Sequence, residues 1–287
     1  MKFILKVQIA LIMILFYGCS DDGVKPVIEK YTENGNPAIV FVVENDNMLG
    51  YEIELGYQMY KNEVLDVFEK IFGVPKEDMK DLELVEIVDI YGEEWMIDEL
   101  TEVAESKYNK ICVLTDETAT ENALLDTLQM LSENDHDIDI IFCLHGSPNS
   151  IHFHQSSQFI GIFTDKITER GIHIRSLYQT NCYGSKTIDD WEKTGIVAVN
   201  GSKEVNSVVL FAPFYFLEEW TGGKSYQDAV LTAFNRELEK YEEYNTPELP
   251  ISILFSSTEV LADSEQHFGG SDPGIFWKNF LNNSENM

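Results

Sequence analysis

Two apolar segments of the sequence are each followed by a residue that could take part in catalysis. Segment 137–144 is followed by His145, and segment 173–181 is followed by Cys182. A cysteine attacks a carbonyl carbon as its thiolate, and a neighbouring imidazole can take the thiol proton and later give it to the leaving amine. If both segments are neighbouring parallel strands, their carboxyl ends open at the same edge of a sheet. We therefore interpret His145 and Cys182 as a candidate catalytic dyad.

Acyl transfer also needs hydrogen-bond donors for the oxygen that becomes negatively charged. Gly146 follows the histidine and has no side chain, so a substrate could approach its N–H closely. The N–H of Cys182, at a predicted strand-to-helix turn, would be the second donor. A His-Gly pair or a cysteine in a loop is usually structural when it occurs alone. The placement of both at strand ends is more specific.

The elements that would position these residues alternate along the chain, which is typical of an α/β fold with a mostly parallel sheet covered by helices on both faces. Apolar and β-branched runs predict strands at 37–43, 82–90, 110–115, 137–144, 173–181, 195–202 and 250–257. Helical periodicity predicts helices at 62–73, 93–106, 118–134, 187–194 and 225–241. Gly73 is expected to stop the first helix, and Thr187 and Ser225 are expected to cap the last two. The alternating pattern of 147–163 predicts a hairpin inserted after His145.

The segments around the dyad resemble those of the caspase-like cysteine peptidases, a family that includes gingipains, clostripain, legumain, separase, metacaspases and bacterial CHAT proteins. "TENALLDTLQMLSENDHDIDIIFCLHGS" is similar to the family's helix, strand and His-Gly unit, and "GIHIRSLYQTNCYGS" is similar to its strand and cysteine unit. "KTGIVAVNGS" and "GGKSYQDAVLTAFNREL" resemble the next strand and helix of CHAT-type members. The resemblance covers roughly residues 110–240. It implies a caspase-like three-layer sandwich with His145 as acid–base, Cys182 as nucleophile, and the Gly146 and Cys182 amides as the oxyanion hole.

Three positions depart from the family's pattern. Many members have a second His or a Ser before the His-Gly pair, where this sequence has Leu144. Members that cleave after arginine often carry an acid two residues before the cysteine, where this sequence has Thr180. Tyr183 follows the cysteine, where some members carry His or Arg. Thr180 and Tyr183 are therefore candidate residues of a specificity pocket, without support for strict arginine specificity.

The amino-terminal segment has the layout of a bacterial lipoprotein signal. Two lysines and a short apolar run precede Gly18 and Cys19, although Phe16 stands where an aliphatic residue is usual. We predict a signal peptide at 1–18, lipidation of Cys19, a tether at 19–35 and one α/β domain at 36–287. An ordinary secretory signal or an uncleaved anchor are the alternatives. The layout predicts a location in the bacterial cell envelope, as an outer-membrane lipoprotein.

Composition limits the partners that this chain could bind. The 287 residues carry a formal net charge of −30, spread along the chain, which repels nucleic acid and anionic lipid. Contact with a membrane is therefore expected through the lipid alone. Hydrophobic residues make up 44 % of the chain, enough for a substantial core. A peptide or protein is the expected ligand.

The remaining cysteines and histidines have simpler interpretations. Cys112 and Cys143 lie inside apolar strands and are expected to be buried, inert thiols, and with Cys182 they leave at least one thiol free. His152 and His154 could bind a metal together with His145, but alternate positions on a hairpin explain their spacing equally well. We expect neither a metal nor another cofactor.

Two functions from different classes follow from these observations. The first is a lipid-anchored cysteine endopeptidase that uses the His145/Cys182 dyad. The second is a catalytically inactive, caspase-like lipoprotein that holds a peptide or protein partner in the same cleft.

Overall fold

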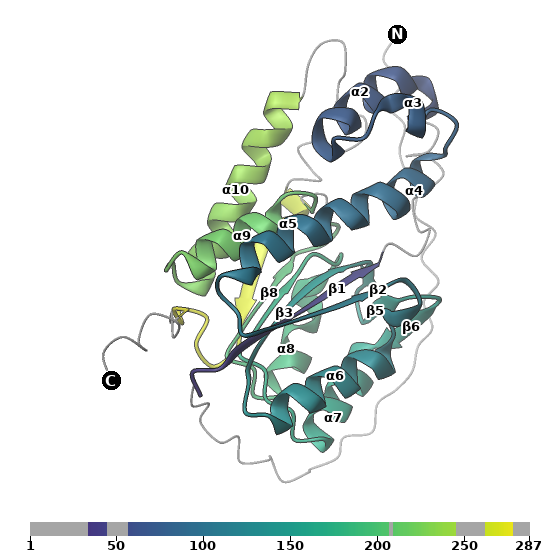
Figure 1. The fold of residues 1–287 in the computed structure, drawn as a ribbon. Coiled ribbons are helices and arrows are strands. Elements are labelled where there is room, and N and C mark those ends of the chain that lie inside the picture. Colours follow the sequence, from purple (N-terminus) through teal and green to yellow (C-terminus); the bar gives the residue numbers. More distant parts are fainter. Residues whose placement is uncertain (1–33, 45–56, 207–208, 245–261, 278–287) are drawn as a thin grey trace.

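The computed structural model describes residues 34–44, 57–206, 209–244 and 262–277, and it confirms the predicted α/β class (Figure 1). Its central feature is a six-stranded sheet in the order β2-β1-β3-β7-β8-β9, in which the first five strands are parallel and β9 runs antiparallel to β8. Its strands are β1 (Pro37–Glu44), β2 (Lys110–Thr115), β3 (Asp137–Leu144), β7 (Ser176–Gln179), β8 (Ala198–Ser202) and β9 (Gln266–Gly269). A second sheet contains β4 (Gly146–Ser147), β5 (Ser150–Phe153) and β6 (Ser156–Phe159).

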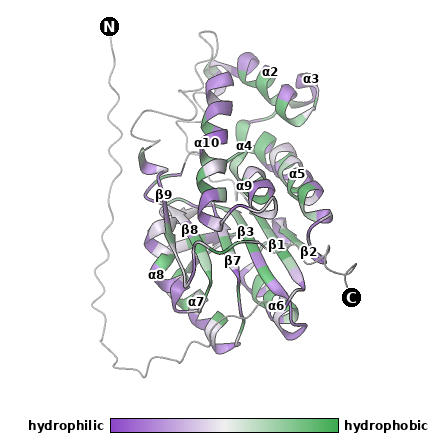
Figure 2. Cartoon of the chain, turned by 90° about the vertical axis from the view of Figure 1, so that its left-hand side faces the viewer, coloured by the Kyte–Doolittle hydropathy of each residue, from purple (hydrophilic) through white to green (hydrophobic). Residues whose placement is uncertain are grey.

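Helices cover both faces of the central sheet, which gives three layers (Figure 1). One face packs against α6 (Glu121–Glu133), α7 (Ile160–Glu169) and α8 (Ile188–Glu192). The other packs against α5 (Glu93–Glu105), α9 (Ala212–Thr221) and α10 (Tyr226–Tyr244). Every residue of β1 is buried, as expected for a strand covered on both sides. Figure 2 shows hydrophobic residues concentrated on the strands and on the helix sides that face them.

A smaller helical layer lies between β1 and α5 in the chain and has an apolar cluster of its own. It contains α2 (Lys61–Phe72), α3 (Lys76–Met79), α4 (Leu84–Ile87) and the π-helix η1 (Val88–Gly92). The predicted strand at 82–90 is therefore wrong. Leu84, Ile87 and Val88 recur at helical spacing and join the cluster, and a capping box between Glu83 and Glu86 starts the helix.

The boundaries of several other elements differ from the sequence prediction. The segment 147–163 contains the predicted hairpin, but α7 already begins at Ile160. Thr187 stands at the N-cap position of α8, as predicted, but its side chain makes no capping hydrogen bond. Its hydroxyl donates instead to Gly184 O at 2.7 Å in the short helix η3 (Gly184–Thr187). The predicted strand at 173–181 pairs only as the shorter β7, and 187–194 forms η3 and α8.

Other predictions about element ends are confirmed. Gly73 ends α2 in the left-handed conformation, with φ of 70°. Ser225 caps α10, since its hydroxyl accepts from Asp228 N–H at 3.2 Å. Neither α9 nor β9 was expected, and the predicted strand at 250–257 lies outside the described residues.

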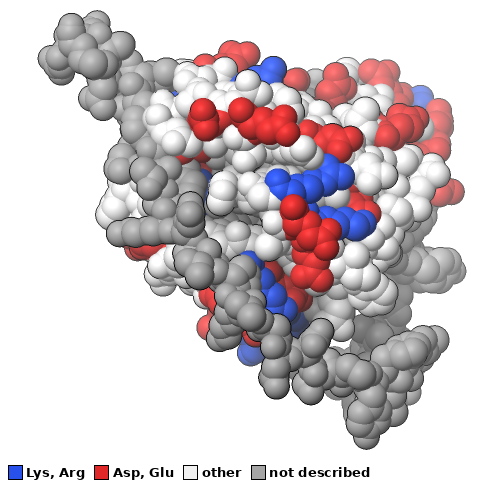
Figure 3. Space-filling model, turned by 90° about the horizontal axis from the view of Figure 1, so that it is seen from below, with Lys and Arg blue, Asp and Glu red and all other residues white. Residues whose placement is uncertain are grey.

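The predicted signal peptide and Cys19 also lie outside the described residues. At the end of the predicted tether, the N–H groups of Asn34 and Gly35 both donate to the Asp137 carboxylate at 2.8 Å. Among the helices that the structure describes, none combines the length and the apolar character needed to cross a membrane. Figure 3 shows acidic side chains spread over one face of the molecule, with a few Lys and Arg side chains among them.

Candidate active site

The strands that precede His145 and Cys182 are parallel neighbours in the central sheet. β3 and β7 pair from Asp139 with Ser176 to Phe142 with Gln179. Beyond the last pair, Thr180 N–H still donates to Phe142 O at 3.0 Å. Continued by three residues, this register sets His145 opposite Cys182. The expectation that both strands end at the same edge of the sheet is therefore confirmed.

Contacts of Gly146 show how closely the two strand ends approach each other. A Cβ placed on Gly146 would lie 2.8 Å from Asn181 Cβ and 2.9 Å from Cys182 O. Real Cβ atoms essentially never come so close to other heavy atoms, so this seam admits glycine and no larger residue. The structure thus brings Gly146 and the main chain of Cys182 together although they are 36 residues apart in sequence.

The second sheet determines where the Gly146 amide points. His152 N–H donates to His145 O at 3.0 Å, and Gly146 is paired with Ile151 in the antiparallel register of β4 and β5. Hydrogen-bonded and non-hydrogen-bonded pairs alternate along an antiparallel ladder. Because His145 and His152 form a hydrogen-bonded pair, the next pair, Gly146 with Ile151, is a non-hydrogen-bonded one. Its N–H is therefore directed away from β5, and its role as an oxyanion donor stays a prediction.

The turn that follows Cys182 is pressed against β8. Tyr183 adopts a left-handed conformation with φ of 60° and ψ of 20°, which is uncommon for a bulky residue, and its N–H donates to Glu204 O. A Cβ on Gly201 would lie 2.2 Å from Gly184 C, so the close contact between this turn and β8 also requires glycine at position 201. Strained residues of this kind persist where the surrounding structure holds them, and they cluster at functional sites.

The thiol of Cys182 is half-buried and is one of three free cysteines in the described part of the chain. Burial raises its pKa above the ordinary value, while the backbone N–H groups of Asn206 and of Cys182 itself lower it in part. The side chain of Asn206 donates to Thr180 O at 2.9 Å, which ties the loop after β8 to the end of β7. Burial therefore favours the neutral thiol over the thiolate.

This raised pKa predicts how the alkylation rate of Cys182 depends on pH. Because the thiolate is the nucleophile, the rate with iodoacetamide should rise about tenfold per pH unit from pH 6 to above pH 8. Quenched reactions followed by peptide mapping would give this rate for each cysteine. A rate for Cys182 that is already constant between pH 6 and pH 8 would show a preformed thiolate and contradict this prediction.

The other predicted cysteines and pocket residues have distinct surroundings. Burial raises the pKa of Cys143 well above its usual range, and burial also raises the pKa of Cys112 on the edge strand β2. Thr180 is almost fully buried, and its hydroxyl donates to Phe142 O at 3.2 Å. Tyr183 is partly exposed beside Cys182. The roles of Thr180 and Tyr183 in a specificity pocket stay predictions.

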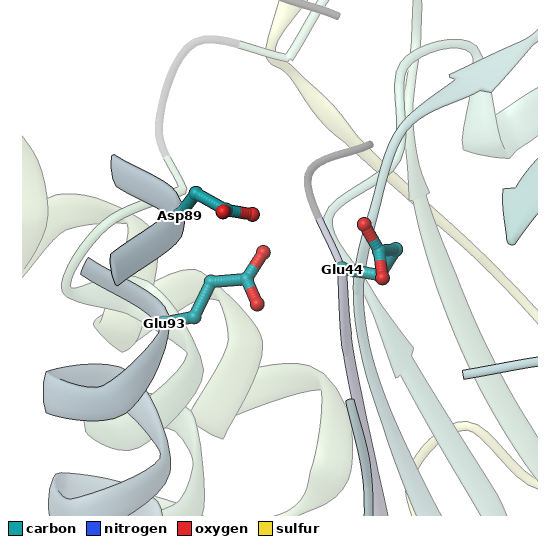
Figure 4. Close-up of side chains that lie close together, drawn as sticks. All are labelled: Glu44, Asp89 and Glu93. Carbon is teal, nitrogen blue, oxygen red and sulfur yellow. The ribbon is translucent and has the colours of Figure 1, made fainter. Parts of the chain in front are cut away.

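A group of carboxylates that the sequence did not single out lies at the carboxyl end of β1. Ligand oxygens of Glu44, Asp89 and Glu93 lie within 4.8 Å of one another, and Figure 4 shows the helical pair Asp89 and Glu93 directed toward Glu44. His154 Nδ1 is 3.0 Å from Glu44 Oε2. Burial, and to a lesser degree Asp116, raises the pKa of Asp89, while His154 lowers it. Distant sequence positions meet here, so no local pattern could have indicated the group.

This carboxylate group differs from the histidine set that the sequence offered as a metal alternative. Among the described residues, the side chains that could share an ion are Glu44, Asp89 and Glu93, and none of the three histidines is included. His154 is turned toward Glu44 instead, and His152 pairs with Ser157 across the hairpin.

Comparisons with known proteins leave the geometry as the basis for a functional conclusion. No protein-family model matches the sequence, and no curated protein matches it either.

Proposed function

We propose that this protein is a lipid-anchored cysteine endopeptidase of the bacterial cell envelope, with a caspase-like fold and a His145/Cys182 dyad. The observation that carries the proposal is the seam at Gly146, where the end of β3 meets the main chain of Cys182 at the end of β7. A strand that ends in His-Gly beside the next core strand that ends in cysteine is the arrangement implied by the family resemblance. Its substrates would be peptides or proteins, and its contact with the membrane would be made by the lipid on Cys19.

In the proposed reaction, a peptide carbonyl lies against the Gly146 and Cys182 N–H groups. His145 takes the proton of the neutral thiol as the sulfur attacks, because burial disfavours the free thiolate. The C–S bond forms, the carbonyl π electrons move to the oxygen, and the two amides stabilise the resulting oxyanion. The C=O bond then re-forms as the C–N bond breaks, and His145 gives its proton to the leaving amine. Water hydrolyses the thioester with the imidazole again acting as base.

A peptide library tests this proposal. The full-length chain, kept in detergent, would be assayed with fluorogenic peptides varied at P1, beside Cys182→Ala and His145→Ala. Cys112→Ala and His173→Ala are matched controls, since Cys112 lies on the edge strand β2 and His173 is exposed. We expect cleavage by the parent and both controls, and a loss of at least about 1,000-fold in the dyad variants. Undiminished cleavage by Cys182→Ala would refute the proposal.

The half-buried, weakly acidic thiol also favours the alternative, an inactive lipoprotein that binds a peptide or partner in the same cleft. Absence of cleavage by the parent, together with tight binding of a library peptide, would establish this second function in place of the first.

A further inference from the structure

Asn181, immediately before Cys182, carries a buried amide that has no structural use. Its side chain is fully buried, and within the residues that the structure describes neither Nδ2 nor Oδ1 has a hydrogen-bond partner. The main chain of Asn181 is anchored, since its carbonyl accepts from Ser202 Oγ at 3.2 Å. Burying an amide without hydrogen bonds costs free energy, so such a group in a folded protein needs an explanation.

Other buried polar side chains near these strand ends have at least one hydrogen-bond partner. Thr180 donates its hydroxyl to Phe142 O at 3.2 Å. Asn200, equally buried on β8, donates to Gln266 at 2.8 Å and accepts from Tyr226 at 2.8 Å. Gln179 Oε1 on β7 has no partner either, but Gln179 Nε2 donates to Asn200 O at 2.6 Å, whereas both polar atoms of Asn181 lack a partner among the described residues.

The position of this amide connects it with the proposed reaction. A Cβ built on Gly146 would lie 3.0 Å from Asn181 Nδ2 and 2.9 Å from Cys182 O. The amide therefore lies in the seam between Gly146 and Cys182, whose N–H groups are the proposed oxyanion donors. The amide is thus adjacent to the two residues that would hold the oxygen.

We propose that Asn181 is a substrate-contacting residue whose Nδ2–H group donates a third hydrogen bond to the oxyanion formed by a peptide carbonyl. The inference rests on the proposed peptidase function. When the Cys182 sulfur adds to the carbonyl carbon, the C–S bond forms, the C=O π bond breaks toward oxygen, and the thiol proton goes to His145. The negative oxygen is then the partner that the Asn181 amide lacks in the free protein. A prepositioned donor of this kind acts mainly on the transition state.

Two reagents that attack the same sulfur separate this role from a structural one. A peptide aldehyde reacts with Cys182 to give a tetrahedral hemithioacetal that needs the oxyanion donors, whereas iodoacetamide alkylates the sulfur by displacement and forms no oxyanion. Asn181→Leu removes both polar atoms at similar size. Ser202→Ala is the matched control, because it alters the support of the same segment and keeps the amide.

In the full-length chain, we expect Asn181→Leu to bind the aldehyde roughly 100-fold more weakly than the parent, with the iodoacetamide rate changed less than about threefold. Asn181→Leu should also unfold at the same or a higher urea concentration, since an unsatisfied buried amide has been removed. Unchanged aldehyde binding, or an equal loss with both reagents, would overturn the role of Asn181. A parent chain that fails to bind the aldehyde although Cys182 is alkylated would instead refute the peptidase function, and this inference with it.

Discussion

Gly146→Ala is expected to lower kcat/KM for peptide cleavage by at least about 100-fold. The added Cβ would lie 2.8 Å from Asn181 Cβ and 2.9 Å from Cys182 O, and neither atom belongs to the far end of a flexible side chain. The two strand ends must therefore separate, which moves His145 and the Gly146 amide relative to Cys182. A misplacement of about 1 Å at a reacting centre can cost roughly 100-fold in rate, and the loss of an oxyanion donor costs as much or more.

A second glycine provides the control for this substitution. Gly161 is in α7, and a Cβ placed there meets Asp190 at an ordinary distance of 3.7 Å. Gly161→Ala should keep its activity, and its helical position should make it equally or more stable. Steady-state kinetics and urea unfolding of both variants would be compared. Overpacking at Gly146 should cost about 1–3 kcal/mol in the free energy of unfolding. Equal activity of the two variants would mean that the seam does not position a reactive pair.

Asp139→Leu is expected to lower the free energy of unfolding by about 3–5 kcal/mol. Asp139 is buried on β3 and accepts from Arg175 Nε at 2.9 Å and from Arg175 Nη2 at 2.6 Å. The hydroxyls of Ser176 and Tyr108 also donate to it, at 2.6 and 2.7 Å. Removing the carboxylate leaves the fully buried Arg175 without the carboxylate that compensates its charge.

A double-mutant cycle tests this interpretation of the buried ion pair. Arg175→Met in the Asp139→Leu background removes both charges, so it should recover more than half of the lost stability. Urea unfolding of the parent, the two single variants and the double variant would give the coupling free energy. Additive losses in the double variant, or a loss below about 1 kcal/mol in Asp139→Leu, would show that the pair is not the main support of this part of the sheet. Since Asp139 lies toward the amino end of β3, these variants also change stability at a distance from the proposed site.

Strong local patterns made the framework of the site predictable. The apolar runs that precede His145 and Cys182 are buried strands in the structure, and the alternating residues between them form the predicted hairpin. The segment 82–90 was predicted wrongly because a short apolar run fits both the strand period and the helix period. In the structure, Leu84 and Ile87 pack against α2 and α3, and this packing stabilises the helix.

Features that depend on tertiary contacts could not be predicted in the same way. The Asn206 side chain reaches the end of β7 only through the packing of β7 and β8. The raised pKa of Cys182 follows from burial, which the sequence of a strand end does not reveal. Glu44 meets Asp89 and Glu93 because a helical segment folds back over the end of β1. The short antiparallel strand β9 is held by its pairing with β8, and its own residues carry little strand signal.

The most direct test of the proposed dyad is covalent labelling of Cys182 by a peptidyl acyloxymethyl ketone. The full-length chain and His145→Ala would be treated in parallel, and the adducts would be located by intact mass and peptide mapping. We predict one adduct on the parent, at Cys182, formed at least about 100-fold faster than on His145→Ala. Equal labelling rates in the two proteins, or an adduct on Cys112 with Cys182 unmodified, would contradict the assignment of His145 and Cys182 as a catalytic pair.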